Sequence, residues 1–146
     1  MATRIVEDQR QRLSVAGHPI HSALLPVPIL CFVGALATDL AYARTEDFMW
    51  LNFSSWLLLV GLIGGGLAGM VAIIDLLRGG SRHRRGLTVL LGAWVVEVFN
   101  SFIHARDGWT AVVPTGMTLS VIAAVLSLLA GWFWQTAAGV EAGDRA

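Results

Sequence analysis

The chain has 146 residues, of which 55% are hydrophobic and only 14% are charged, and its formal net charge is zero. A soluble domain needs about a quarter of its residues charged to cover its surface, so this composition excludes an ordinary soluble fold and predicts a membrane protein. Zero net charge also removes the basic field that attracts nucleic acid, and we therefore expect no nucleic-acid partner.

The chain begins with a polar N-terminal tail. Residues 1–16 carry charges of both signs, which is too polar for a cleavable secretion signal. Four apolar stretches follow, and each meets or approaches the roughly 20 residues that a helix needs to cross a bilayer core. We therefore predict one all-α domain over residues 17–137, an integral membrane four-helix bundle, followed by a second tail over 138–146. The predicted spans are residues 23–42, 53–77, 87–104 and 116–137.

The third stretch is the shortest of the four and contains an acid, Glu97. A re-entrant segment is the competing interpretation. Trp94, Val95 and Val96 keep the stretch apolar enough to favour a complete span.

Arginine placement sets the expected orientation. Lysine is absent, and the predicted spans put eight of the ten arginines on one side of the membrane, with only Arg44 and Arg106 on the other. Cytoplasmic loops carry an excess of basic residues. We therefore expect both termini in the cytoplasm and a multi-pass location in the inner (plasma) membrane.

The most specific local pattern is His18-Pro19-Ile20-His21, followed by Pro26 and Pro28. Pro19 suits the first turn of a helix, which would place both histidines on one face, and the two later prolines should kink or unwind the helix entry. Carbonyl groups freed there, beside two imidazoles, would form a ligand site. The alternative interpretation is a pair of interfacial histidines that cap a kinked helix.

Haem needs two axial nitrogens on opposite sides of the porphyrin, so His18 and His21 on one segment cannot both bind the same iron. One of them together with His83 is geometrically allowed, because all three are expected on the cytoplasmic side. His83 lies among arginines, however, which is also typical of a solvated, lipid-facing patch. A metal site formed by His18, His21 and Asp75 is the other alternative, since imidazole suits zinc, copper or iron.

The second stretch carries Gly61, Gly65 and Gly69 at intervals of four. Glycines at this spacing form a smooth groove, a glycine zipper, that lets another helix backbone approach closely. The favoured interpretation is packing inside the bundle, and an interface between copies of the chain is the alternative.

Ionisable groups inside a membrane are costly, so they are expected to be paired or functional and to face the bundle interior. The helix directions place Asp39 and His104 near the outer face of the membrane, where they can pair, with Asn100 one turn below His104.

Asp75 is expected at the inner end of the bundle, paired with Arg78 or oriented toward the histidines. Glu97 is expected near mid-depth, either protonated, bonded to Asn100 or a tryptophan, or part of a polar pathway.

Several of these segments together resemble a bacterial membrane-protein family known as domain of unknown function 2231. The resemblance begins with the run Gly17–Pro28, continues with Asp39 and covers roughly residues 15–135. It also includes the segments Ile74–Leu77, Leu119–Ser120 and Gly131–Trp132.

The resemblance implies a four-helix membrane protein whose biochemical function is not established. In its histidine placement the family is similar to small membrane cytochromes, and redox-linked genes often lie beside the genes of its members. By association alone, this implies a role in electron transfer or in anchoring an oxidoreductase. Relatives typically carry histidines where this chain has Gly86–Leu91 and Gln135–Val140. The ligand set that the resemblance implies is therefore incomplete here, unless His83 replaces a missing member.

Taken together, the sequence favours a non-catalytic subunit or anchor of a redox-linked membrane complex, surrounded by the lipid bilayer and assembled with that complex or with copies of itself. No phosphate-binding loop, nucleophile elbow or CxxC pair points to an enzyme. Two alternatives stay open. One is an electron carrier that binds b-type haem or a metal, and the other is a small transporter or proton pathway through Asp39, Glu97 and His104.

Overall fold

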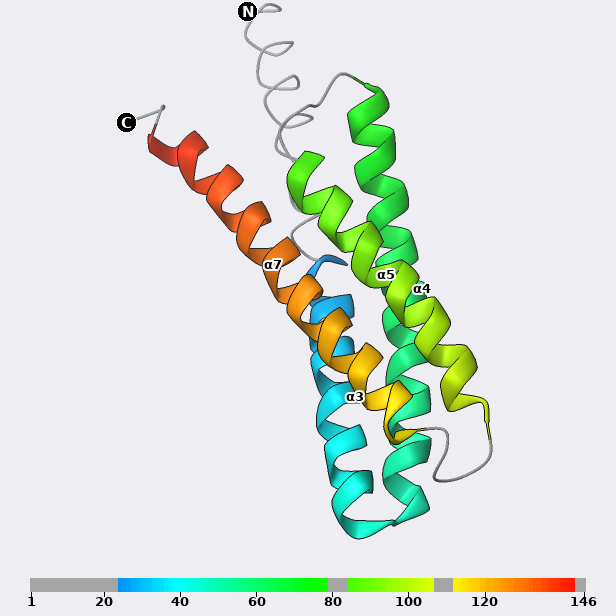
Figure 1. Cartoon of the computed structure of the whole chain (residues 1–146). Helices are drawn as coiled ribbons and strands as arrows, with labels where there is room; N and C mark the ends of the chain where they lie inside the picture. Colours follow the sequence, from blue (N-terminus) through cyan, green and yellow to red (C-terminus); the bar gives the residue numbers. More distant parts are fainter. Residues whose placement is uncertain (1–23, 79–83, 107–111, 144–146) are drawn as a thin grey trace, which may run out of the picture.

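The computed structural model describes residues 24–78, 84–106 and 112–143, and all their regular structure is helical. Four long helices, drawn in Figure 1, make up the described chain. They are α3 (Pro26–Thr45), α4 (Phe48–Leu77), α5 (Arg84–His104) and α7 (Thr115–Gly143). The all-α four-helix architecture predicted from the sequence is confirmed.

Each of the four helices contains a segment long and apolar enough to cross a membrane. Their outward surfaces are rich in large apolar side chains, which water would not tolerate in such number but which lipid accepts. The chain is therefore a multi-pass membrane protein. Examples of these exposed side chains are Leu30, Phe53, Ile63, Leu77, Phe102 and Trp132.

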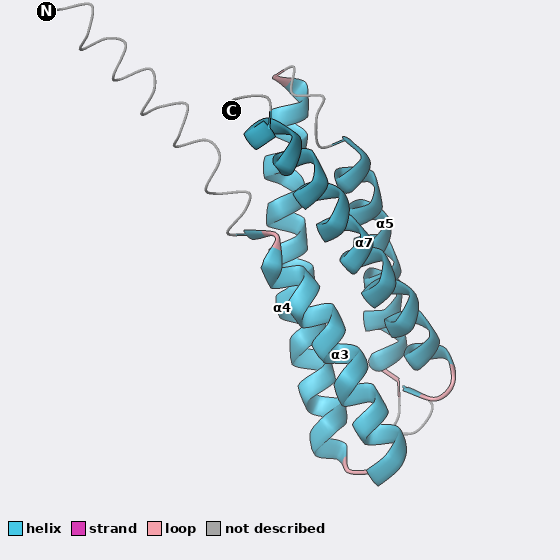
Figure 2. Cartoon of the chain, turned by 90° about the vertical axis from the view of Figure 1, so that its left-hand side faces the viewer, coloured by secondary structure: helices cyan, strands magenta, loops and turns pink. Residues whose placement is uncertain are grey.

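The helices pack in the cyclic order α3, α4, α5, α7. Figure 2 shows α3 and α4 as one long hairpin, with α5 and α7 as the second pair. Only Glu46 and Asp47 separate α3 from α4. Glu46 adopts a left-handed conformation with φ 56° and its N–H donates to the Tyr42 carbonyl, while the Asp47 carboxylate accepts from the Met49 N–H. These are standard ways to end one helix and begin the next. We call this end of the bundle the α3–α4 end.

The helix boundaries differ from those that hydropathy predicts. The first helix begins at Pro26, so its prolines lie in the first turn, where a missing N–H costs nothing, and they do not interrupt the helix. The second helix begins earlier than residue 53 because Asp47 caps it, and the fourth extends to Gly143. At the end of α7, helical hydrogen bonding continues past the apolar segment.

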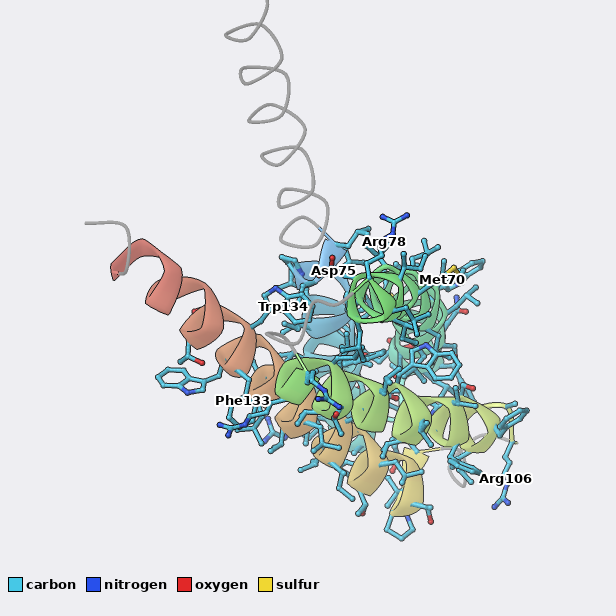
Figure 3. All side chains as sticks on the ribbon, turned by 90° about the horizontal axis from the view of Figure 1, so that it is seen from above. Met70, Asp75, Arg78, Arg106, Phe133 and Trp134 are labelled. Atoms are coloured by element: carbon cyan, nitrogen blue, oxygen red, sulfur yellow. The ribbon has the colours of Figure 1, made fainter. Side chains whose placement is uncertain are left out.

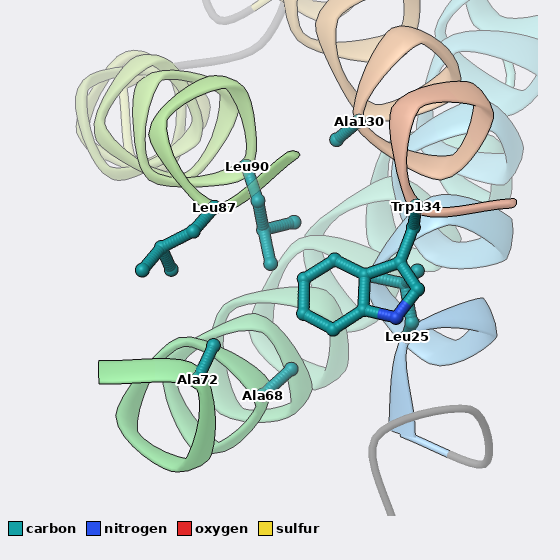
Figure 4. Close-up of a cluster of buried hydrophobic side chains, with 7 residues drawn as sticks. All are labelled: Leu25, Ala68, Ala72, Leu87, Leu90, Ala130 and Trp134. Atoms are coloured by element: carbon teal, nitrogen blue, oxygen red, sulfur yellow. The ribbon is translucent and has the colours of Figure 1, made fainter. Parts of the chain in front are cut away.

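The half of the bundle away from the α3–α4 end has an apolar core. Figure 4 shows that Trp134 of α7 projects into the space between the helices. The Gly86 position explains the close approach of α5 and α7, because a Cβ there would lie 3.2 Å from the Trp134 ring and 3.4 Å from the Ala130 carbonyl oxygen. We call this group of buried side chains the apolar cluster. Its members are Leu25, Ala68, Ala72, Leu87, Leu90, Ala130 and Trp134.

Candidate functional site

The half of the bundle nearest the α3–α4 end contains buried polar side chains from all four helices. Asp39 lies six residues before the end of α3, and Ser54 lies six residues after the start of α4. At 1.5 Å per residue, both are about 9 Å inside that end of the bundle. We call this group the polar network. It consists of Asp39, Ser54, Glu97, Asn100, His104 and Ser120, and all but His104 are fully buried.

Asp39 is the centre of the polar network. Its Oδ1 accepts from the Ser54 hydroxyl at 2.5 Å and lies 2.9 Å from Nε2 of His104. Its Oδ2 accepts from the Ser120 hydroxyl at 2.5 Å. Three donors from three other helices thus surround one buried carboxylate, which is the arrangement that a buried charge needs.

The second ring nitrogen of His104, Nδ1, lies 3.1 Å from the backbone carbonyl oxygen of Asn100. A carbonyl oxygen and a carboxylate oxygen both only accept hydrogen bonds. Because each ring nitrogen faces such an acceptor, we interpret His104 as a cation that donates from both nitrogens. Its charge then balances that of Asp39 inside the bundle.

Glu97 joins the network through Asn100. The Asn100 Nδ2 group donates to Glu97 Oε2 at 2.9 Å and to the Ser120 hydroxyl at 2.8 Å, and Ser120 in turn donates to Asp39. Among the buried side-chain atoms that the structure describes, Glu97 Oε1 and Asn100 Oδ1 are without a hydrogen-bond partner. A continuous hydrogen-bonded chain therefore runs from Glu97 to His104 and leaves two acceptors unsatisfied at one end.

The polar network does two things physically. It ties the four helices together at one depth, where an interhelical hydrogen bond in a membrane contributes about 0.6–2 kcal/mol. It also uses both nitrogens of His104, so that this ring has no free nitrogen with which to bind a metal or a haem iron.

The histidines predicted to hold haem or a metal, His18, His21 and His83, lie outside the described residues. Within the described part of the chain, no group of three His, Cys, Asp or Glu side chains is arranged to hold a metal ion. Asp75 is exposed near the end of α4 (Figure 3), and among the described residues it forms no ion pair with Arg78. The contact between the two is instead made by the backbone, because the N–H of Arg78 caps the helix by donating to the Asp75 carbonyl at 3.2 Å.

The glycines of α4 lie against two different helices. A Cβ at Gly61 would lie 2.5 Å from the Phe32 ring of α3, and one at Gly64 would lie 2.8 Å from Val27. On the α5 side, a Cβ at Gly65 would lie 3.0 Å from Trp94. Gly69 has more room, since its Cβ would meet Leu91 at an ordinary 3.5 Å.

A lipid-facing groove of about 540 Å³ follows α4 from Leu62 to Ile74 and is bordered on α5 by Leu91 and Trp94. Glycines form part of its floor. The Trp94 indole N–H donates to the Leu62 carbonyl at 2.8 Å, which fixes the ring at the edge of the groove. A Cβ at Gly66 would meet only Trp94, at 3.7 Å. We call this feature the α4–α5 groove.

Sequence reasoning missed Ser54 and Ser120 as members of the site. A serine in an apolar helix usually bonds to a carbonyl of its own helix, as Ser127 does with Ala124 at 2.8 Å. The sequence offers one indication of their role, which is their depth in the membrane. When consecutive helices are placed antiparallel, both serines lie at the same depth as Asp39.

The model of a family described as a predicted membrane protein (DUF2231) matches residues 17–142, which is most of the chain. No curated protein and no solved structure matches.

Proposed function

We propose that this chain, which belongs to the DUF2231 family of predicted membrane proteins, is a non-catalytic integral membrane subunit that anchors or assembles with a partner membrane complex. The polar network lies inside the bundle and bonds within it, so we assign the partner to the lipid-facing surface of the described helices. The observation that carries the proposal is the α4–α5 groove.

The occupant that best fits the groove is a transmembrane helix of the partner. The groove extends from Leu62 to Ile74, which is about 18 Å of helix at 1.5 Å per residue, or slightly more than three turns. Gly66 and Gly69 remove side-chain bulk over this length, and close backbone approach at small residues is how helices associate in lipid. Large apolar side chains such as Ile63 and Met70 are exposed beside the glycines and can pack around such a helix.

The arginine distribution supports an orientation with both termini in the cytoplasm and a location in the inner membrane. The redox character of the partner complex is supported only by the family resemblance. A second copy of the chain on the groove is the competing occupant, and the experiment below distinguishes it by mass.

The test is co-purification after mild detergent extraction, with mass spectrometry of the material recovered. Gly66→Leu should fill the α4–α5 groove without a clash inside the bundle, and it should reduce the recovered partner at least several-fold. Gly92→Leu is the matched control, because a Cβ at Gly92 meets nothing within 4 Å and Gly92 does not line the groove. Equal recovery with Gly66→Leu would place the partner elsewhere, and a lone monomer in every preparation would remove the proposal.

A proton pathway through Asp39, Glu97 and His104 is less well supported than the anchor. The polar network occupies only the half of the bundle nearest the α3–α4 end, and the apolar cluster occupies the other half. Protons need a continuous series of polar groups or waters to cross a membrane. Among the described residues, one copy of the bundle has such a series only in the half nearest the α3–α4 end.

A further inference from the structure

We propose that Glu97 carries its proton at neutral pH and forms a two-bond carboxylic acid–amide pair with Asn100, so that the bundle contains a buried proton-binding site. The starting observation is that the two unsatisfied buried acceptors belong to two residues already joined by one hydrogen bond. Asn100 Nδ2 donates to Glu97 Oε2 at 2.9 Å, while Glu97 Oε1 and Asn100 Oδ1 are without partners.

A single hydrogen explains both unsatisfied atoms. An ionised Glu97 offers only acceptors, and so does Asn100 Oδ1, so the two oxygens cannot satisfy each other. With a proton on Oε1, the acid donates to Oδ1 while the amide donates to Oε2. Both residues are fully buried, and a buried acceptor left without a donor is the costly state that such pairing removes.

The charges around Glu97 support the same protonation. The charged groups that act on Glu97 are Asp39 of α3 and His104 of its own helix, and Asn100 links it to Ser120 of α7. The only buried cation among these groups is His104, and Asp39 already balances it. Arg44 and Arg106, the described arginines at this end, are exposed. A second buried carboxylate would therefore leave the network with an uncompensated negative charge inside the membrane.

The surroundings also determine what the site can do. The network comes nearest to the surface at His104, the last residue of α5, and on its other side lies the apolar cluster. Glu97 can exchange its proton toward the α3–α4 end. In the opposite direction the described residues place Ser127, whose hydroxyl donates to the Ala124 carbonyl of its own helix, and then the apolar cluster. The site binds a proton and does not conduct one across the membrane.

The decisive measurement is solid-state NMR of the wild-type chain in lipid with ¹³C-labelled glutamate carboxyls. The chain contains four glutamates, Glu7, Glu46, Glu97 and Glu141. We expect one protonated carboxyl signal and three ionised signals at neutral pH, with the protonated signal lost in Glu97→Gln. Four ionised signals, or a protonated signal that survives in Glu97→Gln, would overturn the proposal. Four ionised signals would instead indicate a water between the two acceptors.

A second experiment, which compares variants at Glu97 by thermal unfolding and infrared spectroscopy, distinguishes a protonated acid from a polar side chain that only fills the position. Glu97→Gln keeps one donor and one acceptor and can form the same two bonds with Asn100, so its thermal unfolding should stay close to that of the wild type. Glu97→Leu should unfold at a clearly lower temperature. The infrared C=O band of the protonated acid should be absent from both variants and present in the exposed control Asp47→Asn, which still caps α4. If the band were missing from the wild type as well, Glu97 would be ionised.

Discussion

His104 Nε2 of α5 lies 2.9 Å from Asp39 Oδ1 of α3, across 65 positions of sequence and inside a membrane-spanning bundle. The exposed fractions of the two side chains are 2% and 0%. A buried charge without a partner is strongly destabilising, so the charge of each residue compensates the cost of burying the other. This pair also joins α3 and α5, two helices that are not neighbours in the cyclic order of the bundle.

The first prediction concerns this ion pair. Asp39→Leu or His104→Leu alone leaves an uncompensated buried charge, and each should lower the free energy of unfolding by about 3–5 kcal/mol. The double variant removes both charges and should lose clearly less than the sum of the two single variants. Equilibrium unfolding in mixed micelles measures all three. Additive losses would show that the two side chains do not stabilise each other.

The second prediction compares two buried serines of α7. Ser120 bonds to both Asp39 and Asn100, whereas Ser127 bonds only to the Ala124 carbonyl of its own helix. Ser120→Ala should therefore reduce stability by about 1–3 kcal/mol, because it leaves buried partners unsatisfied. Ser127→Ala is the matched control and should change stability little, since its own-helix carbonyl keeps its backbone hydrogen bond. Equal losses in the two variants would mean that the interhelical bonds of Ser120 add nothing.

The third prediction compares two glycines of α4. Alanine at Gly61 places its Cβ 2.5 Å from the Phe32 ring, so α3 and α4 must separate, and overpacking of this kind costs about 1–3 kcal/mol. Alanine at Gly66 has a nearest contact of 3.7 Å and should be neutral or slightly stabilising, because alanine favours a helix by up to about 1 kcal/mol over glycine. Thermal unfolding of both variants in the same lipid nanodiscs checks the contrast. A destabilised Gly66→Ala would contradict the lipid-facing position of the α4–α5 groove.

Hydropathy and length were enough to predict four spanning helices, because a bilayer demands about 20 apolar residues for each span. Depth along antiparallel helices also brought Asp39 and His104 to one level. The helix ends were less predictable, since capping by Asp47 and the prolines at the start of α3 act locally and leave no hydropathy signal.

The membership of the polar network could not be derived from the sequence. A spanning helix is apolar on all sides, so its sequence does not show which side faces the bundle interior. That rotation decides whether Ser54 and Ser120 reach Asp39 or bond to their own helices. It also decides that Gly61 packs against α3 while Gly66 faces lipid, although both lie in the same run of glycines.

The last prediction concerns proton conduction. Purified protein in proteoliposomes, with a potassium gradient and valinomycin to set the voltage, should give a proton flux equal to that of protein-free liposomes. The physical reason is the apolar cluster, in which Leu90 and Ala130 are almost completely buried between the polar network and the far end of the bundle. A pH-sensitive dye inside the vesicles measures the flux, and Glu97→Gln serves as the comparison. A flux above the protein-free level that disappears in Glu97→Gln would show that protons pass the cluster, and Glu97 would then be a conducting group and not a closed binding site.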